Sequence, residues 1–417
     1  MSSTTESLTV VTRPTVAIDR LLDWATPQHS LAFVRDGDGV VGIGELLRLE
    51  FRGPDRFTEA AAAWNELSRT AVVHDSVKRS GTGLVALGSF AFDDSSRAVS
   101  VLVVPHVIVG SRDGIQWVTS ISIGDTDPLH GTPDGLPPIP DPPIGKAAPT
   151  AFSPGQMSTQ DFTGTVKAAL SEIARGTAAK IVVARDQTAQ LPDGCDLRIP
   201  LSALAARYPD TFTFAVDGLI GSSPETLVRV QNGTVSARVL AGSAARGDDR
   251  VSDGRAASAL VSSPKDQEEH ALALASVMDT LAPLSSELHA AAEPFALQLP
   301  NLWHLATDID GQLSQQSSAL DLIGVLHPTA AVAGTPTHDA IRLIAELENF
   351  DRGRYAGPVG WVDGSGNGEW AVALRCAQIT GSQITAYAGA GIVAGSDADK
   401  ELAETELKFR PIIEAFG

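Results

Sequence analysis

The sequence is poor in cysteine and in aromatic residues, and it has no long hydrophobic run. Only two of the 417 residues are cysteine, Cys195 and Cys376, too few for a disulfide framework or a thiolate metal site. Both lie in strand-like contexts, where we expect buried, reduced thiols. No apolar run approaches the roughly 20 residues of a membrane-spanning helix, and the N-terminal segment lacks the basic and apolar regions of a signal peptide. We therefore expect a reduced, cytoplasmic protein that does not enter a membrane.

Positive charge is also scarce. The chain has 31 lysine and arginine residues against 50 acidic ones, a formal net charge of -19. This balance argues against nucleic acid or an anionic membrane as a partner. An anionic small-molecule substrate would then need a local cluster of cations or a bound metal. No long heptad pattern or apolar edge indicates a partner subunit, so a monomer is expected.

One break in composition divides the chain. Residues 125–156 are dense in proline and glycine, and no regular element of any length is expected there, because proline removes donors and fixes φ. The break separates an N-terminal part, 1–124, from a longer core, 157–417. We predict one strand over 100–111 and another over 369–379.

Most predicted strands form hairpins and do not alternate with helices. Residues 226–242, for example, turn on Asn232-Gly233. An α+β fold with large, mostly antiparallel sheets forming a layered core flanked by helices is therefore predicted.

A helix with an acidic first turn is predicted from Ser263. Ser263 as N-cap and Pro264 at the first helical position make a strong start. Asp266, Glu269 and His270 continue the apolar stripe of this helix. Either they face the interior, or the first turn is solvated and its acids only favour the helix dipole.

A second acidic face is predicted near the C-terminus, on a helix over about 397–414. Glu401, Glu404 and Lys408 lie on this face. The alternative interpretation is an exposed helix face stabilised by Glu–Lys pairs at i,i+4. Two helices that each offer two carboxylates at i,i+3 could together hold a hard cation. Mg²⁺ is the natural occupant, because it takes oxygen ligands and binds through a few carboxylates plus oxygens of the substrate.

A small-residue stretch precedes the C-terminal helix. Its glycines at 389, 391 and 395 are one residue too widely spaced for a dinucleotide-binding loop, and no βαβ unit surrounds them. Their backbone N–H groups could still approach an anion closely.

Several isolated polar residues lie among small or apolar ones. A buried arginine at position 375 needs a carboxylate partner, which is either a structural ion pair or a functional contact. Three others are more often satisfied polar groups of a core than catalysts: Glu225, His304 and Tyr355.

Taken in order, these segments resemble the chorismate-utilising enzymes, which include isochorismate, salicylate, anthranilate and aminodeoxychorismate synthases. The resemblance covers about 180–410. It rests on ten segments: KIVVARD, GSSPETL, LAGSAARG, SPKDQEEH, LPNLWHLAT, LHPTAAVAGTP, RGRYAGPVGW, GNGEWAVALRCA, AGAGIV and ETELK.

The resemblance implies that the whole chain, 1–417, forms one chorismate-binding catalytic domain with an active site between two large sheets. It implies Mg²⁺ held by Glu269 and Glu404, with Asp266 and Glu401 assisting through waters. The substrate's ring carboxylate would complete the coordination. The remaining implied substrate contacts are Gly242, Ser243, Ala331, Tyr355, Arg375, Gly389, Gly391 and Lys408, and the LWHLAT match adds His304 to the catalytic residues.

Two positions sort this family by chemistry. At the position of Lys180, the water-using members resemble this chain in having a lysine, whereas the ammonia-using members carry glutamine. An amine takes a proton from water only when it is neutral, and burial favours the neutral form. Glu225 matches the family's general acid, and an apolar setting would keep it protonated.

Ala331 is the second position. Family members that go on to eliminate pyruvate typically have threonine there, so the pattern resembles isochorismate synthases, including those of siderophore, salicylate and menaquinone synthesis. Salicylate synthase is the alternative. An amine-transferring synthase and a non-enzymatic chorismate-binding protein fit less well, since Lys180, Glu225 and the metal glutamates are all present.

Overall fold

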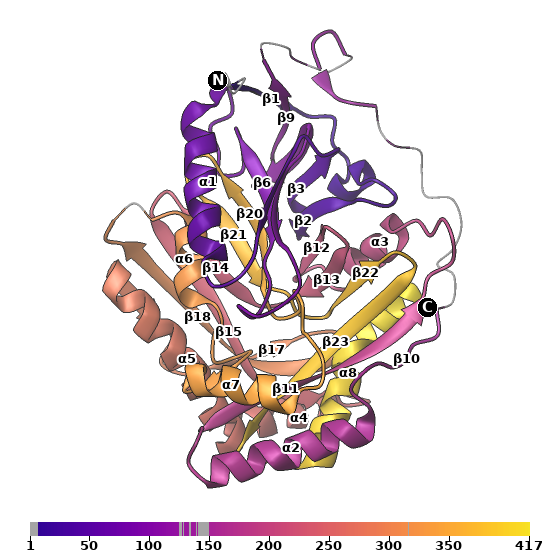
Figure 1. Ribbon diagram of the computed structural model, residues 1–417, viewed down its shortest axis with the longest axis vertical. Helices are drawn as coiled ribbons and strands as arrows, with labels where there is room; N and C mark the ends of the chain where they lie inside the picture. The colour runs from indigo at the N-terminus through magenta and orange to yellow at the C-terminus, as the bar shows by residue number, and fades with distance from the viewer. Residues whose placement is uncertain are drawn as a thin grey trace.

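Two large β-sheets form the centre of the protein, and helices flank them (Figure 1). The computed structural model describes residues 7–124, 127, 129–132, 135–138, 140, 150–315 and 317–417. The predicted break at 125–156 lies in large part outside these residues.

The first sheet has 13 strands among the described residues. In spatial order they are β10 (Ser153–Pro154), β11 (Lys180–Gln190), β23 (Gln383–Val393), β22 (Cys376–Thr380), β13 (Leu219–Ser223), β12 (Phe212–Val216), β2 (Leu31–Arg35), β3 (Asp38–Ile43), β8 (Val107–Arg112), β9 (Ile115–Ile123), β1 (Leu8–Thr15) and β5 (Val72–Asp75), with β19 (Gly334–Thr335) beside β11.

The second sheet has ten described strands. They are β16 (Ser285–Ala290), β18 (Leu302–Leu313), β15 (Thr234–Ala245), β14 (Thr226–Gln231), β21 (Gly368–Val372), β20 (Pro358–Asp363), β6 (Val85–Ser89), β7 (Ser100–Val104) and β4 (Leu47–Phe51), with β17 (Phe295–Gln298) beside β18. Neighbouring strands are antiparallel except for the parallel pair β1 and β5. The predicted α+β fold with large antiparallel sheets is confirmed.

The chain crosses from one sheet to the other at two places where one continuous strand was predicted. In 100–111, β7 belongs to the second sheet and β8 to the first, and Pro105-His106 lies between them. In 369–379, the chain leaves β21 after Val372 and joins the first sheet at Cys376. Both single-strand predictions are wrong, because mostly apolar residues continue on both sides of each change of sheet.

Eight α-helices are described: α1 (Arg56–Thr70), α2 (Thr159–Ala174), α3 (Arg198–Arg207), α4 (Arg250–Ser262), α5 (Pro264–Leu281), α6 (Ala319–Leu326), α7 (Thr337–Leu347) and α8 (Ala398–Phe416). Short 3-10 turns lie at Leu21–Trp24 and Ala282–Leu284. The expectation of a strand-like context for Cys195 is wrong, since this residue lies in the loop before α3. No helix in the described ranges is both long and apolar enough to cross a bilayer.

Side-chain caps set the starts of the two acidic helices, and the cap predicted at Ser263 is confirmed. The Ser263 hydroxyl accepts from the backbone N–H of Asp266 at 3.3 Å, with Pro264 as the first residue of α5. The Asp397 carboxylate accepts from the backbone N–H of Lys400 at 3.0 Å and starts α8. α5 packs mainly against β15 of the second sheet and α8 mainly against β23 of the first, and each helix also contacts the other's strand, so the two acidic faces lie close together between the sheets.

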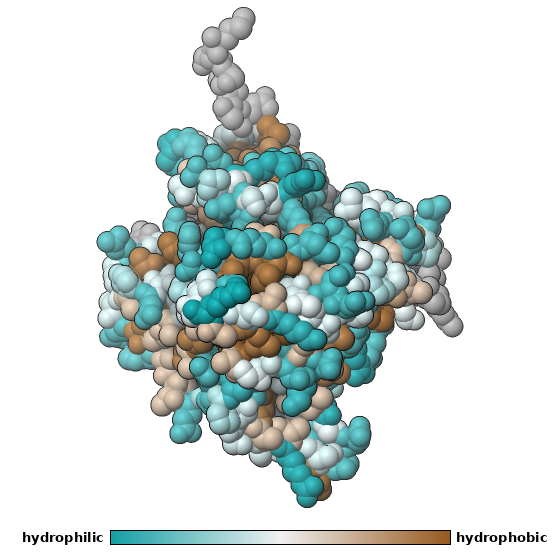
Figure 2. Space-filling model, turned by 60° about the horizontal axis from the view of Figure 1, so that its bottom comes forward, coloured by the Kyte–Doolittle hydropathy of each residue, from teal (hydrophilic) through white to brown (hydrophobic). Residues whose placement is uncertain are grey.

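The main hydrophobic core lies between the sheets, and a second one lies on the outer face of the first sheet. Strand alternation on β2 shows the division, because Phe33 packs in the first core and Val34 in the second. The surface face in Figure 2 is largely hydrophilic, interrupted by small apolar areas.

Candidate active site

Lys180 is fully buried at the start of β11. Its Nζ lies 3.3 Å from Oε1 of Glu269 on α5 and has no hydrogen-bond partner among the described residues. The side chain therefore does not extend to solvent from the strand end. Its amine lies inside the protein, opposite a single carboxylate.

Glu225 lies between β13 and β14 and is 4% exposed. Burial raises the pKa of its carboxyl to about 8, against a smaller opposite effect of the charges on Lys180, Arg375 and Lys408. The side chain is therefore mostly protonated at neutral pH, the state required of a general acid.

Arg375 lies at the crossing from β21 to β22, with a left-handed φ of 49°. The expected carboxylate partner is not found, because among the described residues its guanidinium forms no ion pair. Its Nη2 instead donates to Nε2 of His304 at 2.7 Å. A buried guanidinium without a counter-ion is suited to hold an anionic group of a ligand.

His304, on β18, supports this arginine. Because arginine can only donate, Nε2 of His304 must accept, which leaves the proton on Nδ1. Nδ1 lies 3.2 Å from the Gly242 carbonyl oxygen and 3.0 Å from the Ser243 hydroxyl. Burial, and then the Arg375 charge, hold the pKa of His304 well below its usual value, so the imidazole is neutral. The structure thus places a neutral His304 against Arg375, and both residues line the cavity described below.

His270, on the acidic face of α5, points to the second sheet. Its Nε2 lies 2.8 Å from the Thr307 hydroxyl and its Nδ1 3.2 Å from the Ala241 carbonyl oxygen. It anchors the helix to β15 and β18.

Two glycines on β23 make room for side chains. A Cβ at Gly391 would lie 2.1 Å from Oε1 of Glu269, and one at Gly389 would lie 3.0 Å from the hydroxyl of Tyr355. Tyr355 is buried and stacks on Tyr387, with ring centroids 5.2 Å apart. The glycines are required here for close approach, not for a nucleotide loop.

The acids of α5 and α8 face one another, and lysines neutralise them. Lys265 Nζ lies 3.0 Å from Oε1 of Glu401, and Lys408 Nζ lies 2.5 Å from Oε1 of Glu404. Burial, and then the negative charge of Glu404, raise the pKa of Glu401. Burial likewise raises the pKa of Asp266, with smaller contributions from Glu269 and Glu404.

The four carboxylates lie in a partly buried space, and oxygen donors of this kind are the ligands that Mg²⁺ takes. In the described residues no three potential ligands already converge on one point. The lysine ammonium groups contact the carboxylates individually instead.

These elements enclose one small cavity of about 50 Å³. Lys180 and Glu404 lie beside it, next to Glu269 and Lys408. Of the residues predicted for the site, the cavity is lined by Glu225, Gly242, Ser243, Glu269, His304, Ala331, Tyr355, Arg375, Gly389, Gly391 and Lys408. Sequence reasoning missed the apolar part of the wall, Val182, Leu240, Val332 and Leu374, whose aliphatic side chains carry no chemical signal.

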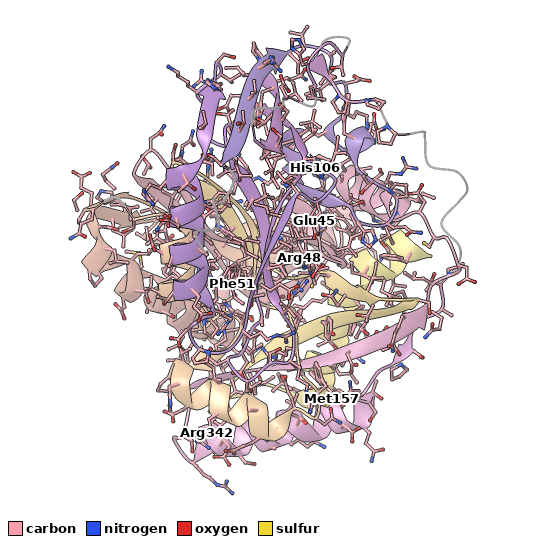
Figure 3. The ribbon with its side chains drawn as sticks, turned by 45° about the horizontal axis from the view of Figure 1, so that its top comes forward. Glu45, Arg48, Phe51, His106, Met157 and Arg342 are labelled. Carbon is pink, nitrogen blue, oxygen red and sulfur yellow. The ribbon has the colours of Figure 1, made fainter. Side chains whose placement is uncertain are left out.

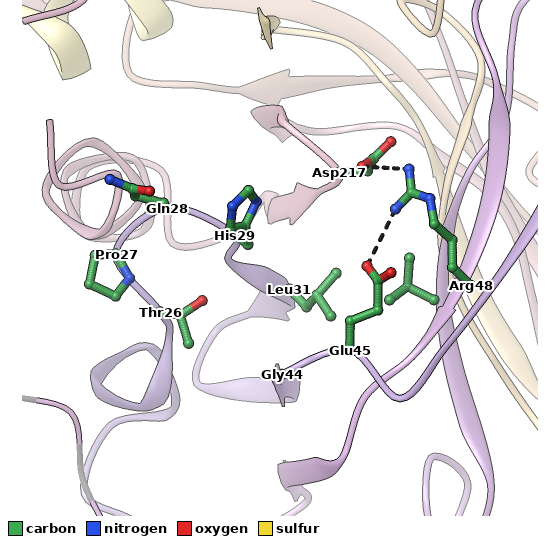
Figure 4. A pocket seen from close by; sticks show the side chains of 10 residues that line it. Thr26, Pro27, Gln28, His29, Leu31, Gly44, Glu45, Arg48 and Asp217 are labelled. Carbon is green, nitrogen blue, oxygen red and sulfur yellow. Dashed lines mark hydrogen bonds and ion pairs between the residues drawn. The ribbon is translucent and has the colours of Figure 1, made fainter. Parts of the chain in front are cut away.

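A larger cavity of about 720 Å³ lies elsewhere, among the N-terminal strands. There Arg48 lies between Asp217, at 2.7 Å, and Glu45, at 3.4 Å (Figure 4). Figure 3 shows Glu45 and Arg48 beside the N-terminal strands, away from Met157 and Arg342. The charged groups of the larger cavity already compensate one another, so the smaller cavity is the better candidate for catalysis despite its size.

The chain matches the family described as "Chorismate binding enzyme" over residues 5–417. The chain belongs to this family. It is similar to the putative isochorismate synthase MenF of Mycobacterium tuberculosis, with 38% identity over 81% of this chain and 88% of that protein. It is also similar to the isochorismate synthase DhbC of Bacillus subtilis, with 40% identity over 62% of this chain and 68% of that protein.

Solved structures of chorismate-binding enzymes share the whole fold. The putative 2,3-dihydroxybenzoate-specific isochorismate synthase DhbC of Bacillus anthracis matches with a TM-score of 0.77 and 30% identity, over 95% of this chain and 98% of that one. The menaquinone-specific isochorismate synthase MenF of Escherichia coli matches with a TM-score of 0.79 and 25% identity, over 99% and 95%.

Proposed function

We propose that this chorismate-binding enzyme is an isochorismate synthase. It would add a water-derived hydroxyl at C2 of chorismate and release the C4 hydroxyl. One observation carries the proposal: a buried lysine and a buried, protonated glutamic acid flank the same cavity. The names of the relatives support the same activity.

The two groups divide the proton transfers. The amine of Lys180 takes a proton from water as the oxygen bonds to C2, and both double bonds of the ring shift. Glu225 gives its proton to the C4 oxygen as the C4–O bond breaks, so that water leaves. One hydroxyl is gained and one is lost, and the product is an isomer of the substrate.

The remaining polar groups bind the two carboxylates of chorismate. Arg375 and Tyr355 would hold the enolpyruvyl carboxylate, with His304 fixing the guanidinium. Lys408 and the backbone N–H groups of Gly389 and Gly391 would stabilise the other carboxylate. Fixed donors of this kind stabilise charge without having to reorganise during the reaction.

Glu269 and Glu404 would bind Mg²⁺ directly, and Asp266 and Glu401 through waters. The ion would supply positive charge that neutralises the ring carboxylate of the substrate. The Lys265–Glu401 and Lys408–Glu404 contacts must loosen when it binds. The cavity must also widen, because pockets for small molecules typically measure about 300–1,000 Å³.

A chromatogram of the products tests this proposal. Purified protein with chorismate and Mg²⁺ should give isochorismate, without salicylate, anthranilate or free pyruvate, and the same mixture with a chelator serves as the control. Ala331 lacks the hydroxyl of pyruvate-eliminating relatives, so early pyruvate release would contradict the proposal in favour of salicylate synthase. Binding of chorismate without turnover would contradict any enzymatic role.

A further inference from the structure

One edge of β11, the strand that begins with Lys180, is only partly covered by other strands. β19 pairs with Lys180 and Ile181, and β10 pairs with Gln187 and Thr188. Among the described residues, 182–186 have no strand ladder on this edge, although the Val182 N–H donates to the Ala333 carbonyl oxygen at 2.8 Å and the Asp186 carbonyl oxygen accepts from the Gly155 N–H at 3.0 Å. The Val182 carbonyl oxygen and the Ala184 N–H are buried and still need hydrogen bonds.

A buried ion pair at the end of α7 fills part of this gap. Oε1 of Glu348 accepts from the backbone N–H of Ala184 at 2.8 Å, and Nη2 of Arg352 donates to the Val182 carbonyl oxygen at 2.9 Å. The two side chains bind each other through Nε of Arg352 and Oε2 of Glu348 at 2.8 Å. The two side chains satisfy backbone hydrogen-bonding groups of β11 as a neighbouring strand would.

Arg352 also contacts two further walls of the cavity, one through its guanidinium and one through its backbone. Its Nη1 donates to the carbonyl oxygen of Val332 at 2.9 Å, and Val332 and Ala331 both line the cavity. The backbone carbonyl of Arg352 accepts from the N–H of Tyr355 at 3.0 Å. One arginine therefore connects the Lys180 strand, the Ala331 wall and the turn that carries Tyr355.

We propose that Glu348 and Arg352 are positioning residues for the reaction. They fix the separation between the strand of Lys180 and the Ala331–Val332 wall, and so the distance from the amine to the substrate ring. The inference rests on the proposed function. A buried ion pair adds little net stability over an apolar pair of similar volume, whereas its directed hydrogen bonds to two opposite walls set geometry.

The test compares Arg352→Lys with Arg112→Lys. Lysine keeps the charge but cannot reproduce the planar fork of donors. Arg112 is a matched control: it is also buried, pairs with Glu369 at 3.3 Å and lies over the Trp361 ring at 5.5 Å, as Arg352 lies over Phe92 at 4.5 Å. It has no contact with the cavity of Lys180.

Arg352→Lys should lower kcat on the order of 10²-fold with little change in KM for chorismate, since small displacements of reacting groups have effects of that size. Both variants should lower Tm by similar amounts, and Arg112→Lys should leave kcat close to that of the wild type. Equal kcat in the two variants, or a loss confined to KM, would overturn the inference.

Glu348→Gln keeps an oxygen for the Ala184 N–H and carries the test if Arg352→Lys does not fold. Loss of one charge-assisted bond should lower its kcat about tenfold, and an unchanged kcat would overturn the inference. Failure of the proposed function would be distinguishable from failure of this inference, because the wild-type protein itself would then form no isochorismate.

Discussion

At the residue scale, the environment of Glu225 gives the site a defined pH dependence. The carboxyl is buried, and its pKa is raised to about 8. It can therefore donate a proton at neutral pH and loses this ability in the alkaline range. An exposed glutamate, with its ordinary pKa near 4.5, could not do so.

We expect kcat/KM, which reports ionisations of the free enzyme, to be nearly constant well below pH 8 and to fall about tenfold per pH unit well above it. The same shift affects stability. Because the folded pKa lies above the unfolded one, the protonated carboxyl's contribution is complete below about pH 4.5 and is lost as pH rises towards 8.

Glu225→Gln should remove both dependences. Its kcat should fall about 10²- to 10⁴-fold, while its Tm at pH 8 should exceed that of the wild type. A pH–rate profile and thermal unfolding at pH 5 and pH 8 measure both. An alkaline limb that persists in the variant would assign it to another group.

Lys180→Ala should abolish turnover and leave chorismate binding largely intact, because Lys180 lies beside the cavity and the carboxylate-binding groups remain. Lys167→Ala, on the exposed face of α2, is the control and should be fully active. Single-turnover kinetics and calorimetric titration with chorismate separate the two effects. Substantial activity in Lys180→Ala would exclude its role as the base.

The residue types of the site could be read from the sequence, but their partners could not. A lysine at a strand end can extend to solvent, and only the three-dimensional structure shows Lys180 fully buried against Glu269. For Arg375 the sequence predicts a carboxylate partner, and the structure pairs it with a neutral histidine from a distant strand. Such contacts depend on how separate segments pack.

At the scale of elements, α5 and α8 bring the two acidic pairs together. Their starts follow from local caps and could be predicted, since capping involves only neighbouring residues. The two crossings between sheets could not be predicted, because mostly apolar residues continue on both sides of Pro105 and of Arg375. The left-handed φ of Arg375 at one crossing turns its side chain into the cavity.

Glu404→Gln should weaken Mg²⁺ binding and raise the Mg²⁺ concentration needed for half-maximal activity at least tenfold, because loss of a charged ligand costs about 10- to 100-fold or more in affinity. Glu414→Gln, on the same helix and paired with Arg207 and Arg410, is the matched control. Metal titration followed by calorimetry and by rate measures the effect. Identical titrations for both variants would move the metal site elsewhere.

At the scale of the whole molecule, the N-terminal residues are part of both sheets. β1, β2, β3, β5, β8 and β9 belong to the first sheet, and β4, β6 and β7 to the second. β12 pairs with β2, and β20 pairs with β6, so strands of the core depend on N-terminal neighbours. In Figure 1 these segments lie side by side although they are far apart in sequence.

A fragment of residues 157–417 should therefore not fold on its own, because it would expose β12 and β20 as long apolar edges. The full chain should unfold in one cooperative transition, measured by circular dichroism and calorimetry. A fragment that melts sharply and binds chorismate would show instead that the core is an independent domain.

The reaction in H₂¹⁸O tests the role of Lys180 most directly. If Lys180 activates water for attack at C2, isochorismate formed in one turnover carries one ¹⁸O at the C2 hydroxyl, seen by mass spectrometry as a two-unit gain. The Lys180→Ala variant should form no labelled product. Unlabelled isochorismate from the wild type would mean that the C4 hydroxyl migrates without water, which would contradict the account.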